Sequence, residues 1–402
     1  MRVLMTTFGS RGDVEPIAGL AAELRARGAE AVVCAPPDEE FRQRLDGLGV
    51  ELVPMGEPVR PQLSGDRPPS TADAPRRAAG LVESQFAAVM RAGADCDAVI
   101  GTGLPPAGAA LAAERLGVRY VCAAFVPGVI PSPLVRPLAR PGRPYPADET
   151  DNLVLWDIDA ANIRDLYGPA LNAHRAALGL DPVEDVRGYI LTDRPWLATD
   201  PVLGPWPEAP GYAAVQTGAW FVPDERPLPE DLEAFLDAGD PPVYVGFGSM
   251  PWKNGREAAE AAVAAVRAQG RRLVVSRGWA DLGATGGDCF AVGESNHRKL
   301  FARMAAVVHH GGAGTTHKAA AAGAPQVVVP QIADQPYWAG RVAALGIGAG
   351  HDGPVPTFDA MTAALETALA PETKARAVEV AGRMRTDGAA RTAELLIEGR
   401  AA

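Results

Sequence analysis

Short apolar runs alternate with helical segments along most of the chain, and this alternation constrains the fold more than any other feature. Buried strands separated by helices predict a parallel sheet with helices on both faces. In the first half, helices are predicted at Ile17–Arg27 and Ala107–Leu116, and strands at Val3–Thr7, Ala31–Ala35, Ala98–Gly101, Tyr120–Phe125 and Tyr189–Thr192.

A proline-rich region interrupts the alternation, which then starts again. Proline lacks an amide hydrogen and fixes its own backbone torsion, so Pro201–Pro210 and Pro223–Pro229 resist both helix and central strand. The 402 residues suit two domains. The second series has strands at Val243–Gly246, Leu273–Ser276, Cys289–Val292, Val307–His309 and Gln326–Val329, and helices at Glu257–Ala268, Thr315–Ala322, Thr357–Leu369, Glu372–Met384 and Ala389–Glu398.

These patterns predict an α/β protein with two doubly wound, Rossmann-like domains in series. We place an N-terminal domain at 1–205, an interdomain linker at 206–228 and a C-terminal domain at 229–385. A C-terminal helix follows at 386–402, with packing back on the first domain as one option.

Charge and composition exclude several kinds of partner. The net charge of -11 argues against a nucleic-acid surface and against a broad polybasic membrane patch. No apolar run has membrane-spanning length, and the N-terminus has no signal-peptide pattern. The four cysteines are scattered without metal-ligand spacing, which is typical of a reducing cytosol. We therefore expect a cytoplasmic, monomeric protein without a metal or a cofactor.

Two proline-rich segments, Arg60–Arg76 and Pro127–Pro146, have little periodicity. Loops of this length are functional or mobile. They follow strands of the first half, so they either contribute to a binding site or form disordered surface loops.

The segment His309–Thr316 carries the strongest local signal for a binding site. An apolar strand enters a glycine-rich turn, His310-Gly311-Gly312-Ala313-Gly314, and Thr315 opens a helix. Glycines let the backbone approach an anion closely, and a helix start offers free amide hydrogens and a positive dipole end. We interpret this turn as a phosphate cradle, and a capped glycine turn without a ligand is the alternative.

A second strand–glycine turn–helix, Gly9–Pro16, follows the first strand. Ser10, Arg11, Gly12 and Asp13 fall at the carboxyl end of that strand, where ligands of parallel sheets gather. Asp13 either caps the helix or accepts a proton from a substrate. A third turn, Gly246–Met250, brings a hydroxyl from Ser249 after the first strand of the second domain, or is a plain strand-to-helix turn.

A fourth turn, Pro330–Pro336, contains Asp334 and Gln335, whose carboxylate and amide suit vicinal sugar hydroxyls; a capped helix start is the alternative. No nucleophile elbow, Walker lysine or clustered metal-ligand spacing is present in the sequence, and we interpret the acidic run Glu225–Asp240 as solvated surface.

Taken together, the four turns resemble the GT-B glycosyltransferases that act on natural products, in order over nearly the whole chain. Narrower similarity lies in three segments, which resemble the actinobacterial enzymes that glycosylate vancomycin- and teicoplanin-type heptapeptides: Asp193–Pro201, Val215–Trp220 and Asp224–Leu228. The resemblance implies two Rossmann-like domains facing a central cleft, an N-terminal one that binds the acceptor and a C-terminal one that binds the nucleotide sugar. It also implies an inverting, metal-independent transfer from a TDP- or UDP-sugar to a hydroxyl of a glycopeptide aglycone.

The resemblance also implies a role for each matched residue. Asp13 would be the base, Asp334 and Gln335 would contact the donor sugar, and Ser295 would hold the nucleobase through its backbone. A diphosphate leaving group needs its developing charge neutralised, which amide hydrogens and a helix dipole can do without a metal. The residues expected to bind the nucleotide diphosphate are Ser10, Arg11, Gly12, Ser249, His310, Gly311, Gly312, Gly314 and Thr315.

The chain departs from the wider family pattern at two points. Uridine-donor relatives carry a ribose-binding glutamate eight positions after the phosphate histidine, where this chain has Lys318, and this gives thymidine donors some weight. Relatives with a histidine base in the opening turn also differ, because the first histidine here is His174. Alternatives are a polyketide, macrolide or lipid-like acceptor, and a non-catalytic GT-B partner protein. A dinucleotide oxidoreductase is disfavoured because its glycine fingerprint is missing.

Overall fold

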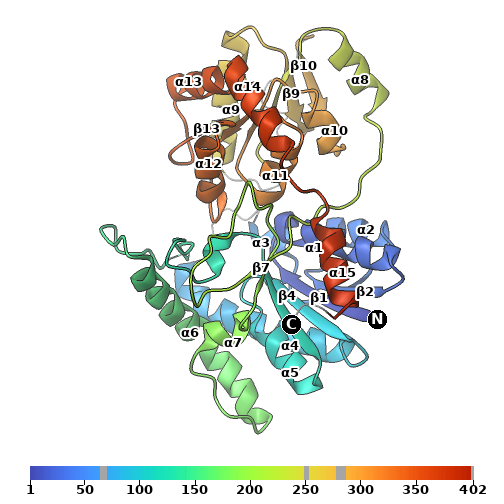
Figure 1. Cartoon of the computed structure of the whole chain (residues 1–402), viewed down its shortest axis with the longest axis vertical. Coiled ribbons are helices and arrows are strands. Elements are labelled where there is room, and N and C mark those ends of the chain that lie inside the picture. The colour runs from blue at the N-terminus through green and yellow to red at the C-terminus, as the bar shows by residue number, and fades with distance from the viewer. Residues whose placement is uncertain (64–69, 141, 249–252, 278–286, 400–402) are drawn as a thin grey trace. The chain divides into compact units, whose positions relative to one another are not determined.

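The computed structural model describes residues 1–63, 70–140, 142–248, 253–277 and 287–399 (Figure 1). The chain divides into two compact units, and each is described by itself. The first consists of Met1–Thr199, Pro205–Pro223 and Asp387–Ala402, and the second of Asp200–Gly204 and Asp224–Thr386.

A seven-stranded parallel sheet forms the centre of the first unit within the described residues, in the order β3-β2-β1-β4-β5-β6-β7. Its strands are β1 (Arg2–Phe8), β2 (Glu30–Ala35), β3 (Glu51–Pro54), β4 (Ala98–Gly103), β5 (Arg119–Ala124), β6 (Trp196–Leu197) and β7 (Val215–Gln216). Its helices are α1 (Arg11–Ala26), α2 (Glu39–Asp46), α3 (Val59–Leu63), α4 (Ala74–Ala92), α5 (Ala107–Leu116), α6 (Asn152–Ala177), α7 (Val186–Leu191) and α15 (Gly388–Ile397), with short 3₁₀ turns at Thr71–Asp73 and Pro127–Val129.

Alternate residues of β1 supply two separate hydrophobic layers, because successive side chains of a strand point to opposite faces. Val3 and Met5 pack in one layer with residues of α1 and α15. Leu4 packs in the other layer with residues of α4 and α5. Both faces of the sheet are therefore covered by helices, as the apolar runs predict.

A six-stranded parallel sheet, in the order β10-β9-β8-β11-β12-β13, forms the centre of the second unit within the described residues. Its strands are β8 (Val243–Gly246), β9 (Leu273–Ser276), β10 (Cys289–Val292), β11 (Ala306–His309), β12 (Gln326–Val328) and β13 (Gly348–Gly350). Its helices are α8 (Glu230–Asp237), α9 (Lys253–Ala268), α10 (His297–Phe301), α11 (Ala313–Ala321), α12 (Gln335–Ala344), α13 (Phe358–Leu369) and α14 (Pro371–Ala381).

Strand register in this second sheet brings three of the predicted turns to one edge. His309 at the end of β11 is level with Gly246 of β8 on one side and with Val328 of β12 on the other. The turns after β8, β11 and β12 therefore begin side by side at the carboxyl ends of their strands, where ligands of parallel sheets bind.

The predicted linker, 206–228, differs from the structure. Most of it, Pro205–Pro223, belongs to the first unit: it includes β7, and Trp220 is buried there. The indole N–H of Trp220 donates to the hydroxyl of Thr392 in α15 at 2.8 Å. A Cβ at Gly19 of α1 would lie 2.6 Å from the backbone of Phe221. The prolines predicted a linker, but this extended segment packs into the first unit through long-range contacts. Helix α15 itself packs against α1 (Figure 1).

Two element predictions also need correction. Tyr189–Thr192 was predicted as a strand, but Val186–Leu191 forms helix α7, whose first turn is capped by the Asp185 carboxylate. Helix α1 begins at Arg11, six residues before the predicted start, because Ser10 caps it and its only internal proline, Pro16, is close enough to the start to be tolerated. Long helix α6 was not predicted, because its 26 residues lack a strong apolar periodicity.

The proline-rich segment after β5 is anchored in its described residues. The indole of Trp156 in α6 donates to the carbonyls of Ser132 and Val135, at 3.0 and 2.8 Å. The buried carboxylate of Asp159 accepts from the guanidinium of Arg140 at 2.6 Å. Helix α6 therefore holds this loop in place, which argues against the disordered alternative.

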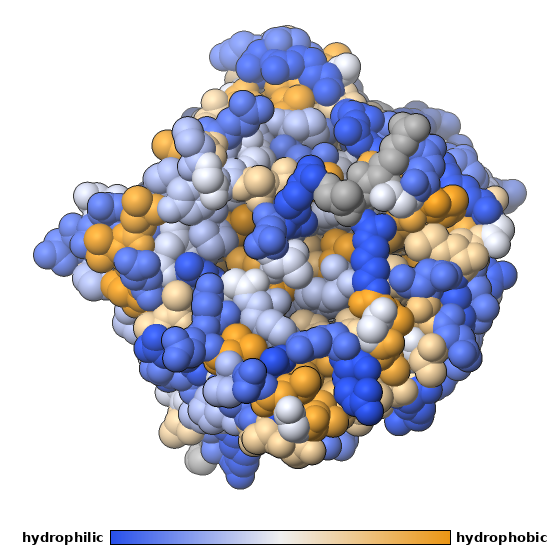
Figure 2. Space-filling view, turned by 60° about the horizontal axis from the view of Figure 1, so that its bottom comes forward, coloured by the Kyte–Doolittle hydropathy of each residue, from blue (hydrophilic) through white to orange (hydrophobic). Residues whose placement is uncertain are grey.

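Within the described ranges, every helix is too short or too polar to serve as a transmembrane span. On the face displayed in Figure 2, apolar residues lie in small groups between polar ones. Such scattered apolar groups are usual on protein surfaces.

Candidate active site

The turn after β11 builds the first part of the candidate site from two histidines with different roles. His309 is fully buried: its Nδ1 accepts the amide hydrogen of Gly311 at 3.0 Å, and its Nε2 lies 2.9 Å from the Gln326 Oε1. Burial lowers the pKa of His309 to about 3, so the ring stays neutral and keeps its acceptor nitrogen toward Gly311. His309 therefore shapes the turn rather than contacting a ligand.

His310, the next residue, lies between two glycines of neighbouring turns. A Cβ at Gly312 would lie 2.6 Å from its Nε2, and a Cβ at Gly248 would lie 3.0 Å from its Cε1. Burial lowers the pKa of His310 to about 4, although a hydrogen bond with the backbone of Gly246 opposes the shift. Its Nδ1 is buried without a hydrogen-bond partner among the described residues. A buried polar atom in this state destabilises the folded protein unless a ligand or a water molecule forms a hydrogen bond with it.

The start of α11 supplies backbone donors beside His310. Gly311 has a φ of +86°, and a Cβ there would lie 2.7 Å from the Val328 side chain, so only glycine fits this turn. Gly312 is the N-cap residue, and no side chain among those described caps the helix there. The leading amide groups of α11 therefore have no side-chain acceptor, which leaves a helix N-terminus suited to an anion.

Thr315 and Thr316, in the first turn of α11, have different roles. The hydroxyl of Thr316 donates to the carbonyl of Gly312 at 3.0 Å and is buried, so it serves the helix. Thr315 is partly exposed, and a Cβ at Gly314 would meet no atom within 4 Å. Open space therefore borders Gly314 and Thr315, next to the uncapped amides.

The turn after β12 presents Asp334 and Gln335 at the start of α12. The indole N–H of Trp338 donates to the Asp334 Oδ2 at 2.7 Å, and burial raises the pKa of the Asp334 carboxyl although this hydrogen bond opposes the shift. The Gln335 Oε1 accepts the amide hydrogens of Gln331 and Ile332, at 2.7 and 3.0 Å. The carbonyl oxygen of Gln335 would lie 3.2 Å from a Cβ at Gly311, so this turn adjoins the first one.

Backbone strain marks the same turn. Ala333 has a φ of +54°, a left-handed conformation that L-residues other than glycine seldom adopt. The two hydrogen bonds to Gln335 constrain the backbone just before it. Strain held in place by surrounding contacts is typical of functional turns.

Ser295 and Ser249 complete the predicted set in this unit. Ser295 lies between β10 and α10, and its hydroxyl is buried without a hydrogen-bond partner among the described residues. Strands β9 and β8 lie between β10 and β11 in the sheet, so Ser295 and the turn after β11 come from strands that are not neighbours. Ser249 lies outside the described residues.

The start of α1, in the other unit, has a different chemistry. Ser10 is the N-cap: its hydroxyl accepts the Gly12 amide hydrogen at 3.3 Å, and its own amide donates to the Asp13 Oδ2 at 2.8 Å. Asp13 folds back so closely that a Cβ at Gly9 would lie 2.1 Å from its Oδ2. The amides of Ser10 and Gly12, expected to bind phosphate, thus already have acceptors within the turn. Arg11 is exposed.

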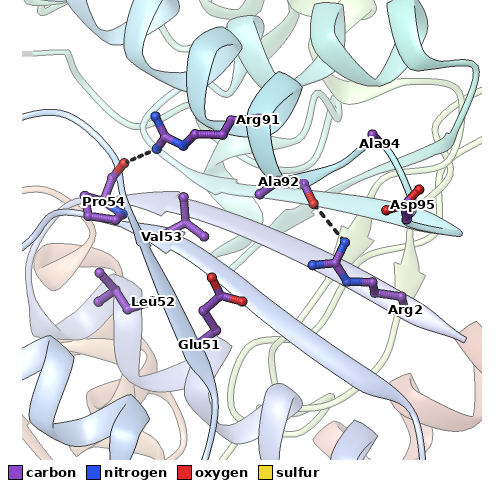
Figure 3. Close-up of a pocket in the computed structure, with 9 residues that line it drawn as sticks. All are labelled: Arg2, Glu51, Leu52, Val53, Pro54, Arg91, Ala92, Ala94 and Asp95. Atoms are coloured by element: carbon purple, nitrogen blue, oxygen red, sulfur yellow. Dashed lines mark hydrogen bonds between the residues drawn. The ribbon is translucent and has the colours of Figure 1, made fainter.

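A pocket of about 410 Å³ lies elsewhere in the first unit, along edge strand β3 (Figure 3). The guanidinium of Arg91 donates to the Pro54 carbonyl at 3.1 Å, and that of Arg2 donates to the Ala92 carbonyl at 3.2 Å. These arginines tie the C-terminal end of α4 to the sheet, and the pocket contains none of the residues of the four turns. We assign it no part in the site.

Among the described residues, no group of three or more His, Cys, Asp or Glu side chains is arranged to hold a metal ion.

The sequence analysis missed two residues that shape the site. Trp338 follows Asp334 by four positions, a helical spacing that could have suggested the contact. His317 is buried in α11 and contacts Asp200, and no local signal in the sequence reveals that pairing.

Two parallel α/β units with glycine turns at the carboxyl ends of their strands fit the GT-B class, and comparisons with known proteins identify that class. Residues 289–396 match the erythromycin biosynthesis protein CIII-like C-terminal domain, and residues 15–159 match the glycosyl transferase 4-like domain. The fold is similar to that of the kitacinnamycin glycotransferase, with a TM-score of 0.69 at 20% identity over 99% of this chain and 98% of that one. Glycosyltransferase VinC gives a TM-score of 0.67 at 21% identity over 99% of both chains.

Sequence relatives are far more similar. Glycosyltransferase GtfE of Amycolatopsis orientalis is 53% identical over 98% of this chain and 97% of its own length. The vancomycin aglycone glucosyltransferase of the same organism is 51% identical over 99% and 97%. Its dTDP-epi-vancosaminyltransferase is 47% identical over 94% and 93%. The chain belongs to this family of vancomycin-type glycosyltransferases, which confirms the resemblance and the enzyme class.

Proposed function

We propose that this enzyme transfers a sugar from a nucleoside diphosphate sugar to a hydroxyl group of a glycopeptide aglycone. Identity above 50% to the vancomycin aglycone glucosyltransferase, over nearly the full length of both chains, carries the proposal. The uncapped start of α11 and the unpartnered Nδ1 of His310 support a diphosphate at that turn. Asp334 and Gln335 begin the adjoining helix, where a donor sugar attached to that diphosphate would lie.

The reaction we propose inverts the configuration at the anomeric carbon of the sugar and uses no metal. Asp13 takes the proton of the acceptor hydroxyl, whose oxygen bonds to the anomeric carbon while the bond from that carbon to the diphosphate oxygen breaks. The nucleoside diphosphate leaves with the electron pair, and the amides of α11 together with neutral His310 stabilise its added charge.

We favour thymidine over uridine donors. Lys318, on α11, stands where uridine-donor relatives place a ribose-binding glutamate, and a deoxyribose lacks one of the hydroxyls for that contact. VinC was solved in complex with dTDP, which supports the same preference by analogy. The protein would act as a monomer in the cytosol, in keeping with its free cysteines.

Product analysis tests the proposal. Purified enzyme is incubated with TDP-glucose or UDP-glucose and a vancomycin-type aglycone, and mass spectrometry should detect the aglycone plus one hexose. Nuclear magnetic resonance of the product should show a β-linkage from the α-linked donor. Absence of product with every donor and aglycone, despite nucleotide binding, would favour the non-catalytic alternative.

A macrolide acceptor is the second candidate. The O-mycaminosyltylonolide 6-deoxyallosyltransferase of Streptomyces fradiae is 34% identical over 92% of this chain and 90% of its own length. A macrolide aglycone therefore belongs in the same assay. Faster turnover of the macrolide than of the heptapeptide would replace the first acceptor with the second.

A further inference from the structure

A five-residue segment, Asp200–Gly204, belongs to the second unit although the chain on both sides of it belongs to the first. Asp200 is fully buried and anchors the segment. Its Oδ1 accepts the amide hydrogens of Val202 and Leu203, at 2.8 and 2.9 Å. Its Oδ2 accepts the amide hydrogen of Arg385 at 2.7 Å, just before the chain enters the first unit again at Asp387. One carboxylate thus ties together two places where the chain passes between the units.

His317 connects this carboxylate residue to the proposed phosphate-binding helix. It is buried in α11, four residues after Ala313. Its Nδ1 lies 2.7 Å from the Ala313 carbonyl oxygen, and its Nε2 accepts the Asp200 amide hydrogen at 3.3 Å. Because a carbonyl only accepts and an amide N–H only donates, Nδ1 carries the hydrogen and the ring is neutral. Burial lowers the pKa of His317, which keeps it neutral.

The second donor-site helix, α12, is tied to the same segment. Arg341 donates from its guanidinium to the carbonyls of Leu203 and Val202, at 2.8 and 3.2 Å. Trp338 packs edge-on against His317, with ring centroids 4.8 Å apart. The same indole donates to Asp334. The starts of α11 and α12, which carry the proposed donor ligands, therefore share one support.

We propose that His317 is a positioning residue of the donor site, which holds the phosphate-binding start of α11 against Asp200. This inference rests on the proposed function, since the start of α11 must bind the nucleotide diphosphate. His317 is buried and both ring nitrogens bond to protein groups, so it acts through the Ala313 carbonyl at one nitrogen and through Asp200 at the other. Loss of the ring frees the first turn of α11, where glycine rather than a capping side chain begins the helix.

Three substitutions separate the two hydrogen bonds. His317→Phe fills the volume and removes both. The side-chain amide of Asn can donate to the Ala313 carbonyl, as Nδ1 does, whereas the longer Gln side chain can present an acceptor to the Asp200 amide, as Nε2 does. Calorimetry with TDP should show affinity about tenfold weaker for His317→Phe, because part of the free energy of the two lost hydrogen bonds appears as lost affinity. His317→Gln should recover most of the loss, and His317→Asn should recover less.

Two controls distinguish positioning from general destabilisation. Val266→Ala removes core volume at the last turn of α9, in a helix of the same unit that carries no proposed donor ligand. It should lower the melting temperature and leave TDP affinity unchanged. In turnover assays, His317→Gln should restore the KM for the nucleotide sugar, and the KM for the acceptor should stay constant throughout.

The outcomes separate the two proposals. Wild-type enzyme that binds neither TDP nor UDP would overturn the proposed function, and the role of His317 with it. Wild-type binding together with unchanged affinity in His317→Gln and His317→Asn, and in His317→Phe if it folds, would overturn the positioning role alone. An equal loss of affinity in Val266→Ala would also overturn it, because loss of stability would then explain the effect.

Discussion

The starts of α1 and α11 have the same local plan and opposite chemistry. Each follows a parallel strand through a glycine turn at the strand's carboxyl end. The first is closed by its own side chains, because Ser10 accepts backbone amides and Asp13 brings a carboxylate to the helix start. The second begins with Gly312, has no capping side chain among the described residues, and adjoins a buried histidine nitrogen without a partner.

The difference in capping suits the two helix starts to different roles. A helix start that already holds a carboxylate repels a phosphate, whereas an uncapped start attracts one. We therefore assign the diphosphate to the start of α11, and we assign the start of α1 the role of positioning Asp13. On this assignment Ser10, which the sequence suggested as a phosphate ligand, orients that aspartate through its amide.

Removal of the Asp13 carboxylate should have the largest effect. Asp13→Asn keeps an oxygen for the Ser10 amide and loses the base, so turnover should fall by about 10²- to 10⁴-fold with nucleotide affinity unchanged. Asp13→Ala loses the cap as well, and its melting temperature should fall further. Turnover near the wild-type level in Asp13→Asn, measured under saturating donor, would reduce Asp13 to a helix cap.

Added methyl groups should distinguish the two helix starts next. A Cβ at Gly12 would meet only the Ser10 hydroxyl oxygen, at 3.6 Å, and a Cβ at Gly314 would meet nothing within 4 Å, so both alanine variants should fold. Gly314→Ala should weaken TDP binding about tenfold, because its methyl enters the space we assign to the diphosphate. Gly12→Ala should bind normally. Wild-type affinity in Gly314→Ala would remove Gly314 from the site.

Acid should destabilise the folded protein through His309, which shapes the turn before α11. Its pKa is about 3 in the folded protein against an ordinary 6.5, so the unfolded chain binds a proton that the folded chain excludes. Unfolding free energy is unaffected by this group above pH 6.5 and falls as the pH drops below it, by about 2 kcal/mol at pH 5. His309→Asn keeps an acceptor for the Gly311 amide without titrating. Urea titrations at pH 7 and pH 5 should show a smaller loss for this variant.

The smallest effect should come from the cap itself. Ser10→Ala removes the hydroxyl that accepts amides of α1 and should cost about 1 kcal/mol of stability. Affinity for TDP should not change if the start of α1 binds no phosphate. A clear drop in affinity, measured by calorimetry at a temperature where the variant is folded, would restore Ser10 to the phosphate site.

Much of the fold was accessible from the sequence, since buried parallel strands carry apolar runs and glycine turns punctuate them. The positions of His310, Gly312 and Asp334 at the carboxyl ends of strands followed from the same pattern. The sequence did not show whether each helix start is capped by a side chain, because Ser10 and Gly312 both suit an N-cap. The helix at Val186–Leu191 was missed for a related reason: an isolated run of six apolar and polar residues has no decisive period.

By itself, therefore, the sequence determined two parallel α/β series, their glycine turns and the family of the chain, because these depend on neighbours a few residues apart. Tertiary structure alone decided what the turns can do. Asp200 reaches the amide of a residue 185 positions away and the ring of one 117 positions away. Trp220 binds Thr392 across 172 positions and draws most of the predicted linker into the first unit. Such pairings depend on how folded elements pack, and no local pattern in the chain encodes them.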